Sequence, residues 1–337
     1  MSCMSVKLMA WCFVILAGSM GARADQLKLV ATTGMVGDVV RAVAGDQAKV
    51  QVLMGEGVDP HLYKARSSDV RAMLSADGVF YTGLLLEGRM GEALRKTADR
   101  GHEVVAVAES IPSSRLLKSE EEEGHADPHL WMDVSLWSRI TVVVQETLCR
   151  IDPANCEIYK ANARSYLEEL TQLDLYVRMV IESIPEDQRV LVTAHDAFGY
   201  FGRAYGVEVR GIQGVSTDSE AGLADMNNLV RFLVERKIPA VFVESSIPEK
   251  NVRALQEGSQ SAGHVVIVGG ELFSDAMGRP GTWPGTYVGM MDHNASTIAG
   301  ALGGHPIEGG YRAWRKNRRT AQSNEDGESG KNGESAP

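Results

Sequence analysis

The segment CEIYKANARSYLEELTQLDLYVRMVIES, residues 156–183, forms a single long helical pattern. Its apolar side chains recur every three to four residues, which is typical of an amphipathic helix. These side chains are Tyr159, Ala163, Tyr166, Leu170, Leu173, Val177, Val180 and Ile184. Pro185 follows and ends the pattern, because proline cannot continue a helix. A helix of about 28 residues is about 42 Å long, so it can run the height of one domain and join it to another.

Short β-branched runs alternate with amphipathic helical segments on both sides of this helix. Before it, the pattern predicts strands over 27–32, 49–54, 78–83 and 103–108, and helices over 35–44, 67–76, 88–98 and 133–149. After it, the pattern predicts strands over 189–194, 207–212, 240–244 and 264–268, and helices over 196–205, 222–236, 248–261 and 286–302. Such alternation is typical of βαβ units. The sequence therefore predicts an α/β fold of two lobes, each a mostly parallel four-stranded sheet flanked by helices, joined by one long rigid backbone helix.

The length of 337 residues also favours two domains, since one domain holds about 150 residues as a rule. We expect an N-terminal lobe over 25–155, a linking helix over 156–185 and a C-terminal lobe over 186–305. The remainder, 306–337, ends in RKNRRTAQSNEDGESGKNGESAP, whose charge and Gly/Ser content cannot form a core. We predict that this segment is a disordered tail.

The N-terminus has the pattern of an export signal over residues 1–24. Lys7 precedes an apolar run over 8–18, and Ala22-Arg23-Ala24 fits the small-x-small pattern of a signal peptidase site. The apolar run is shorter than the roughly 20 residues that span a bilayer, so cleavage after Ala24 is favoured over an uncleaved anchor in the inner membrane. Ser19 stands where a lipoprotein has its lipid-bearing cysteine. The sequence thus predicts a periplasmic protein without a lipid anchor.

The charge of the mature chain excludes some partners. Removing residues 1–24 takes away Lys7 and Arg23, so the formal charge changes from −10 to −12. An acidic chain is not expected to bind nucleic acid or an anionic membrane surface, but it attracts cations. Cys149 and Cys156 are the two cysteines left, and the sequence is compatible with either one short-loop disulfide or two free thiols.

Three of the eight histidines follow predicted strands. His61 lies on the loop after the strand 49–54, His129 on the loop after 103–108, and His195 at the end of 189–194. In open α/β sheets, ligands bind at the carboxyl ends of the parallel strands, so these imidazoles are expected at one crevice. His102 and His264 precede their strands and are expected at the opposite edge, while His293 and His305 have no predicted role.

The loop GGELFSDAMG after the last predicted strand offers a fourth ligand, either Glu271 or Asp275. Three imidazoles and one carboxylate suit a divalent transition metal such as zinc, iron or manganese better than calcium or magnesium. Asp59 and Asp127, two residues before His61 and His129, are expected to orient these imidazoles.

Other polar and aromatic residues at this edge have supporting roles. Glu244 is interpreted as a carboxylate that supports the site, and Asp196 as the cap of the following helix. Tyr63 and Trp131 each lie two residues past a histidine, and we expect them to pack against the site or in the core.

Six motifs together resemble the metal-binding receptors of ABC importers, the family of TroA, ZnuA and PsaA, and most of all its TroA-type members. They are VDPHLY, ADPHLW, VTAHDAFGYF, GVSTDSE, VFVESSIP and GGELFSDAMG, in this order between about residues 27 and 303. The resemblance implies a metal bound between two α/β lobes by His61 and His129 from the first and His195 and Asp275 from the second. It also implies delivery to a membrane permease that works with a cytoplasmic ATPase. We expect a monomer that closes only modestly on its metal, since a continuous linking helix restricts hinge bending.

Two departures from the family pattern leave the metal open. The loop LKSEEEEGHADPH has one extra histidine, His125, where zinc-scavenging relatives often have a His-rich loop. Its acidic residues 120–123 are interpreted as a solvated loop rather than a metal trap. Many manganese-type relatives have a carboxylate where this chain has His195. Zinc, manganese and iron all remain candidates.

Two other classes of protein fit part of this pattern. A zinc metallohydrolase also uses histidines and a carboxylate, but catalytic zinc keeps an open position for water, and neither H-E-x-x-H nor G-x-S-x-G occurs in the chain. An exported adhesin with a structural metal differs from a transport receptor in that its metal does not exchange without unfolding.

Overall fold

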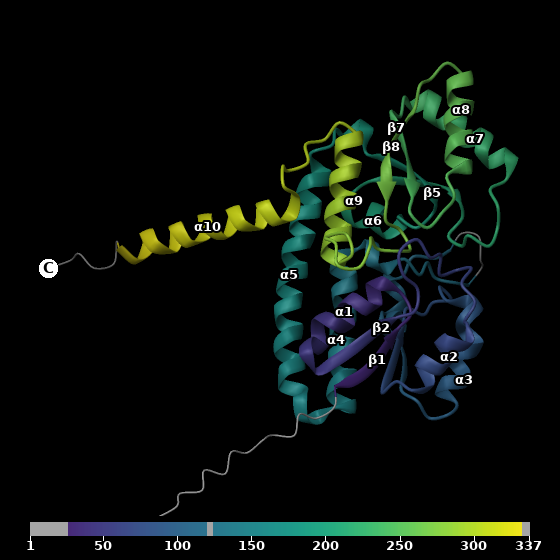
Figure 1. The fold of residues 1–337 in the computed structure, drawn as a ribbon. Coiled ribbons are helices and arrows are strands. Elements are labelled where there is room, and N and C mark those ends of the chain that lie inside the picture. Colours follow the sequence, from purple (N-terminus) through teal and green to yellow (C-terminus); the bar gives the residue numbers. More distant parts are fainter. Residues whose placement is uncertain (1–25, 120–123, 332–337) are drawn as a thin grey trace, which may run out of the picture.

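A computed structural model describes residues 26–119 and 124–331 of the chain (Figure 1). The predicted signal segment and the acidic residues 120–123 lie outside the described residues. Two α/β lobes are stacked along a long helix, α5, which runs beside both of them (Figure 1). In the part of the chain that the structure describes, no helix is both long and apolar enough to cross a membrane.

The first lobe contains one parallel four-stranded sheet, as predicted. Its elements are β1 (Leu27–Ala31), α1 (Gly34–Ala44), β2 (Ala48–Val52), α2 (Ser67–Leu74), β3 (Gly78–Tyr81), α3 (Gly91–Ala98), β4 (Val104–Ala106) and α4 (Val134–Ile151). The strand order is β2-β1-β3-β4, and all three pairings are parallel. Because parallel strands end at the same edge, the loops after β2 and β4 leave on the side of the second lobe.

Helix α5 spans Cys156–Glu182, close to the predicted 156–183. The predicted apolar stripe is buried along its length, and the helix packs against α1 and α4 in the first lobe and α9 in the second. Cys149 and Cys156 form a disulfide between the end of α4 and the start of α5, which decides between the two alternatives that the sequence left open. A single unbroken helix thus forms the spine of the molecule.

The second lobe departs from the predicted four-stranded sheet. Its elements are β5 (Val190–His195), α6 (Gly199–Tyr205), β6 (Glu208–Gln213), α7 (Leu223–Arg236), β7 (Ala240–Glu244), α8 (Lys250–Ser261), β8 (Ile267–Leu272) and α9 (Tyr287–Ala301). The strands form two parallel pairs, β5-β6 and β7-β8, and β5 lies beside β7 without a ladder. At the end of β5, the backbone N–H of His195 donates to the Glu244 carboxylate, so a side chain takes the place of a strand partner there.

The strand predicted over 264–268 begins later, at Ile267, and extends to Leu272. The apolar run HVVIV suggests a buried strand from residue 264, but Val265 and Ile267 are 72% and 53% exposed. A register shift between Val241 and Phe242 marks the pairing of β7 with β8, and Gly270 has a φ of 147°, which glycine adopts freely.

The prediction of a disordered tail over 306–337 is wrong for Gly310–Lys331, which form helix α10. The start of this helix is held by tertiary contacts that composition does not reveal. The Tyr311 N–H donates to Asp292, and the rings of Tyr311 and Trp314 pack against Tyr176 of α5. Beyond these contacts α10 projects away from the body of the molecule (Figure 1). Residues 332–337 lie outside the described part of the chain.

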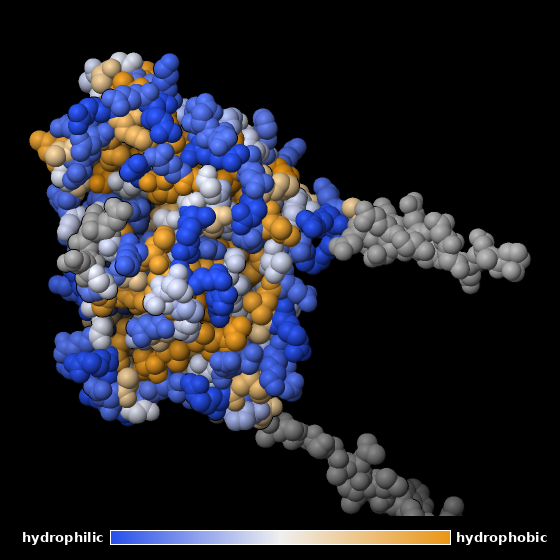
Figure 2. Space-filling model, turned by 180° about the vertical axis from the view of Figure 1, so that it is seen from behind, coloured by the Kyte–Doolittle hydropathy of each residue, from blue (hydrophilic) through white to orange (hydrophobic). Residues whose placement is uncertain are grey.

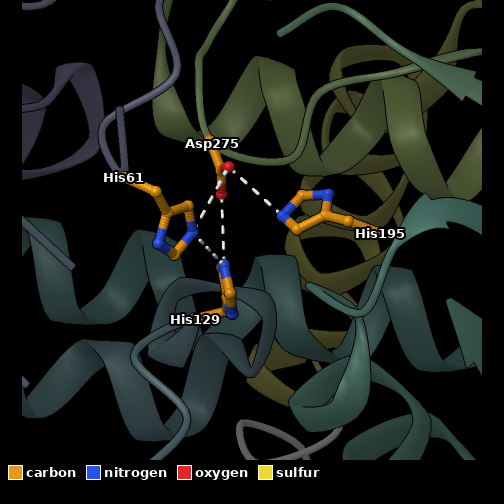
Figure 3. Close-up of side chains that lie close together, drawn as sticks. All are labelled: His61, His129, His195 and Asp275. Carbon is orange, nitrogen blue, oxygen red and sulfur yellow. Dashed lines mark hydrogen bonds and ion pairs between the residues drawn. The ribbon is translucent and has the colours of Figure 1, made fainter. Parts of the chain in front are cut away.

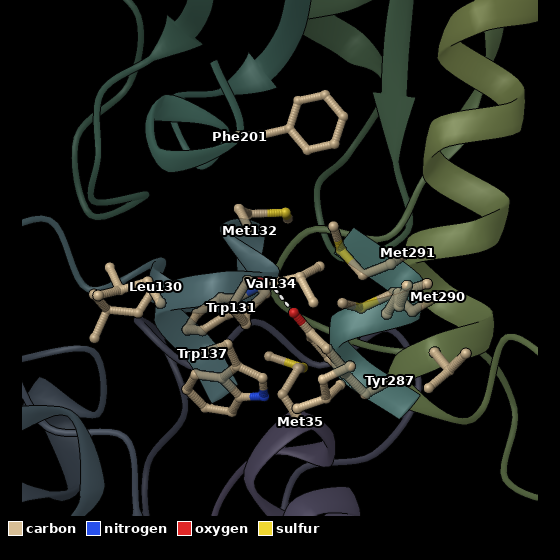
Figure 4. Packing of buried hydrophobic residues seen from close by; sticks show 14 of the residues in the cluster. Met35, Leu130, Trp131, Met132, Val134, Trp137, Phe201, Tyr287, Met290 and Met291 are labelled. Atoms are coloured by element: carbon tan, nitrogen blue, oxygen red, sulfur yellow. Dashed lines mark hydrogen bonds between the residues drawn. The ribbon is translucent and has the colours of Figure 1, made fainter. Parts of the chain in front are cut away.

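One apolar core continues through both lobes. It includes Trp131, Trp137, Tyr287 and Met290, which pack together between α1, α4 and α9 (Figure 4). The Tyr287 hydroxyl, from the second lobe, donates to the Trp131 carbonyl oxygen, from the first, at 2.7 Å. The face shown in Figure 2 mixes hydrophilic and hydrophobic residues. The lobes are therefore joined by buried apolar packing as well as by α5.

Candidate metal centre

Four side chains that the sequence singled out meet between the lobes (Figure 3). His61 lies on the loop after β2, and His129 precedes a short 3-10 helix, Leu130–Met132. His195 is the last residue of β5, and Asp275 follows β8 by three residues. Each lobe thus supplies two of the four, at or just after the carboxyl ends of its strands.

Their polar atoms face one another at short range. Asp275 Oδ1 lies 3.2 Å from His129 Nε2, and Asp275 Oδ2 lies 3.2 Å from His195 Nε2 and 3.7 Å from His61 Nε2. His61 Nε2 and His129 Nε2 are 3.3 Å apart. All four ligand atoms lie within 4.8 Å of one another. Ligands about 2.0–2.2 Å from a tetrahedral ion are roughly 3.3–3.6 Å apart, so this spacing fits a transition metal.

Burial also favours an ion at this place. His129, His195 and Asp275 are at most 2% exposed, and His61 is 6% exposed. Both carboxylate oxygens of Asp275 are buried, and ring nitrogens of His129 and His195 face them at 3.2 Å. A buried carboxylate needs a positive partner, which protonated imidazoles supply in the metal-free protein and a metal ion would supply in their place.

Two further carboxylates hold the imidazoles from behind. Asp127 Oδ1 lies 2.7 Å from His129 Nδ1 and also accepts a hydrogen bond from the backbone N–H of His129. Glu244 Oε2 lies 2.6 Å from His195 Nδ1. A carboxylate at Nδ1 places the proton there and leaves Nε2 free to bind a metal. The predicted supporting roles of Asp127 and Glu244 agree with these contacts.

The prediction for Asp59 is wrong in its detail. Asp59 Oδ1 accepts the backbone N–H of His61 at 2.8 Å rather than a ring N–H, and Oδ2 accepts the hydroxyl of Thr217 from the second lobe. The reason is local geometry, since an aspartate two residues before a backbone amide readily bonds to it. Asp59 therefore fixes the loop and only indirectly the ring.

The charges of the site shift the pKa values in opposite directions. Burial disfavours the protonated ring of His129, but the Asp127 and Asp275 carboxylates outweigh it and raise the pKa to about 9. For His195, burial is likewise outweighed, by Glu244 and Asp275, and the pKa lies well above its ordinary value. Burial would raise the pKa of Asp275, but His195 and His129 hold it well below the ordinary value. Burial lowers the pKa of His61 to about 4.

The aromatic residues after the two loop histidines differ in role. The Trp131 ring packs edge-on against His129, with 5.2 Å between centroids, and its Nε1 donates to the carbonyl oxygen of Ser274. Trp131 thus supports the ligand loops of both lobes. Tyr63 instead donates its hydroxyl to Asp69, at the start of α2.

Other candidates lie outside the site. Glu271 is exposed, and its carbonyl oxygen is bonded by the ring of His293. His264 bonds to the carbonyl oxygen of Ile238 and has a structural role. Asp196 does not cap α6, whose N-cap is Phe198 without a side-chain bond.

Sequence reasoning missed the polar contacts between the lobes beside His61. Besides Thr217 and Asp59, Arg89 of the first lobe pairs with Asp218 of the second. Thr217 and Asp218 belong to the segment GVSTDSE, and nothing local in it indicates which residues it contacts.

Comparison with known proteins agrees with this site. The model of the family described as the periplasmic component A of the zinc-uptake complex, ZnuA, matches residues 29–301. The zinc-binding protein TroA of Treponema pallidum is 53% identical over 287 residues, 85% of this chain and 92% of that protein. The manganese-binding lipoprotein MntA of Bacillus subtilis is 47% identical over 285 residues, 84% of this chain and 92% of that protein.

Solved structures share the fold. The periplasmic zinc-binding TroA from Treponema pallidum superposes with a TM-score of 0.80 at 51% identity, covering 82% of this chain and 99% of that one. The Fe(III)-bound YtgA from Chlamydia trachomatis superposes with a TM-score of 0.75 at 26% identity, covering 83% and 99%. These relatives bind zinc, manganese or iron. The fold, the buried His3Asp group and the match over most of the chain together show that this protein belongs to the ZnuA/TroA family of metal-binding substrate-binding proteins.

Proposed function

We propose that the protein is an exported receptor that captures a divalent transition metal ion between its lobes and delivers it to an ABC importer. The importer would consist of a membrane permease and a cytoplasmic ATPase. The observation that supports this best is the convergence of four ligand atoms within 4.8 Å, two from each lobe. A site built from both lobes lets a transporter distinguish the loaded from the empty receptor.

His61, His129, His195 and Asp275 are the proposed ligands, and zinc, manganese or iron is the proposed cargo. The donor set of three imidazoles and a carboxylate suits all three ions. Four protein ligands complete a tetrahedral shell, whereas a catalytic zinc keeps one position for water. This supports transport rather than hydrolysis.

Several features outside the site belong to the same proposal. Residues 1–24 direct export and are cleaved, which places a monomeric receptor in the periplasm. The lobes extend over 25–155 and 186–305, with the linking helix over 156–185 between them. The periplasmic family description and the lipoprotein relative agree with a site of action outside the cytoplasm.

Metal titration of the metal-depleted protein tests this function. We expect one Zn²⁺, Mn²⁺ or Fe²⁺ ion per chain, measured by calorimetry and by elemental analysis of protein from its native host. His195→Ala and Asp275→Ala should each lose most of the affinity. His305→Ala, which changes an exposed histidine outside the site, should bind as the wild type does. Equal binding by His195→Ala and the wild type would refute the proposed site.

A further inference from the structure

A segment of the second lobe reaches over the least buried ligand. Residues 214–222, between β6 and α7, contribute Thr217 and Asp218, and both contact the first lobe. The Thr217 hydroxyl donates to Asp59 Oδ2 at 2.7 Å. Asp218 pairs with Arg89, next to the start of α3. Both contacts cross between the lobes and are polar, whereas the packing beneath the site that also joins the lobes is apolar.

Asp59 connects the first of these contacts to the metal centre. Its Oδ1 accepts the backbone N–H of His61 at 2.8 Å while its Oδ2 holds Thr217. A single carboxylate therefore ties the second lobe to the backbone of a ligand from the first. If Thr217 moves away, Asp59 loses one of the two bonds that fix its position, and the His61 loop loses its support from the second lobe.

A cavity beside this segment borders the most exposed of the four ligands. This cavity, of about 210 Å³, is lined by His61 together with residues of both lobes, among them Arg89, Pro128, Val215, Ser216 and Asp218. The other three ligands do not line it, and each is less exposed than His61, which is 6% exposed. Of the four ligands, this cavity therefore reaches His61, and Val215, Ser216 and Asp218 of the segment form part of its wall.

The two contacts differ in strength. Thr217 is only 9% exposed, and its bond is to a carboxylate, which is the stronger kind of hydrogen bond. The side chains of Arg89 and Asp218 are 40% and 49% exposed, and ion pairs so open to water are weak. The Thr217–Asp59 bond is therefore the dominant contact.

We propose that residues 214–222 form a latch over the metal centre, in which the Thr217–Asp59 bond positions His61 and limits the rate of metal exchange. This inference rests on the proposed function and extends it from binding to release. Thr217 and Asp59 are positioning residues, since they contact the metal only through His61. The Arg89–Asp218 pair adds a smaller contribution that salt weakens.

Zinc release from the full mature protein tests the latch. The protein is loaded with one equivalent of Zn²⁺, and release into excess chromogenic chelator is followed by stopped flow. Thr217→Val should keep the zinc stoichiometry but release zinc on the order of tenfold faster, as expected for a lost hydrogen bond to a charged group. Thr217→Ser should restore slow release, and Arg89→Ala should quicken it less than about threefold.

Thr171→Val is the matched control, because Thr171 also makes one hydroxyl bond, to the Leu167 carbonyl oxygen, but on the exposed side of α5. It should release zinc at the wild-type rate. Thr217→Ala replaces Thr217→Val if the valine variant does not fold. Normal zinc uptake with unchanged release in the Thr217 variant would overturn the latch alone. A wild type that binds no zinc would overturn the proposed function and the latch with it.

Discussion

At the residue scale, the carboxylates around His129 determine how protons compete with metal. Its pKa of about 9 in the metal-free protein means that the ring is protonated at pH 7. The ion pairs of protonated His129 with Asp127 and Asp275 stabilise the metal-free fold. This contribution is full below pH 6.5 and is lost as the pH rises through about 9. A metal must displace this proton and the one on His195, whose pKa is also raised. The competition therefore extends to higher pH than the ordinary histidine pKa of about 6.5 suggests.

Zinc affinity should accordingly fall as the pH falls from 9 to 6.5, by up to about a hundredfold per pH unit when about two protons are displaced. Calorimetry at pH 7 in buffers of different ionisation enthalpy should detect their release. A dissociation constant that does not change between pH 7 and 9 would contradict the raised pKa of His129.

Glu244 should matter for affinity although it is not a ligand. Its carboxylate lies 2.6 Å from His195 Nδ1 and also accepts a hydrogen bond from the backbone N–H of His195. The variant Glu244→Gln removes the negative charge that orients the imidazole. We expect zinc binding to weaken about 10–100-fold, as for other residues behind metal ligands. Glu271→Gln, at an exposed carboxylate that the sequence also offers as a ligand, is the control and should bind as the wild type does. Equal affinities of the two variants would show that Glu244 has no such role.

At the scale of elements, the disulfide fastens α4 to the start of α5. Cys149 and Cys156 close a short loop, with a sequence separation of 7. A loop of this size should stabilise the fold by about 2 kcal/mol through the entropy of the unfolded chain. Denaturant unfolding of the Cys149→Ala/Cys156→Ala variant should show a loss of this order. Zinc affinity should not change, because the disulfide is at the far end of the first lobe (Figure 1). Wild-type stability in the double variant would contradict this estimate.

At the scale of the whole molecule, α5 and the shared core limit how far the lobes can separate. Helix α5 packs against both lobes, and buried residues such as Trp131 and Tyr287 bond across the interface. A wide opening would expose this apolar surface to water, at a free-energy cost of about 25 cal/mol per Å². Scattering of the metal-free and zinc-loaded protein should therefore differ little in radius of gyration. Local changes should concentrate in the loops around His195 and Asp275, and a large compaction on zinc binding would refute a rigid spine.

Much of this architecture was predictable because its signals are local. The three-to-four spacing from Tyr159 to Ile184 predicts α5 to within a residue, and the alternation of strands and helices predicts the α/β lobes. The candidate ligands follow from one rule, since His61, His129 and His195 each come after a strand of a parallel sheet. For Asp275 the sequence alone left Glu271 as an alternative, and the resemblance to a family favoured the aspartate.

Composition and local patterns misled where distant contacts decide. The composition of the charged segment with Tyr311 and Trp314 predicts disorder. The segment forms a helix whose start is held by a hydrogen bond to Asp292 and by ring packing against Tyr176. The second lobe has two strand pairs instead of one sheet, and the Glu244 carboxylate of β7 bonds to the end of β5, a partner that the sequence does not reveal.

The sequence by itself determined most of the strands, the long helix α5 and the residues able to bind a metal, since periodicity and strand ends depend on neighbouring residues. Only the tertiary structure decided what those residues contact. It placed Asp275 against three imidazoles, put Glu244 behind His195 and turned Asp59 toward Thr217 in the other lobe. The physical reason is that such bonds join residues far apart in the chain, and their partners are chosen by how the two lobes pack.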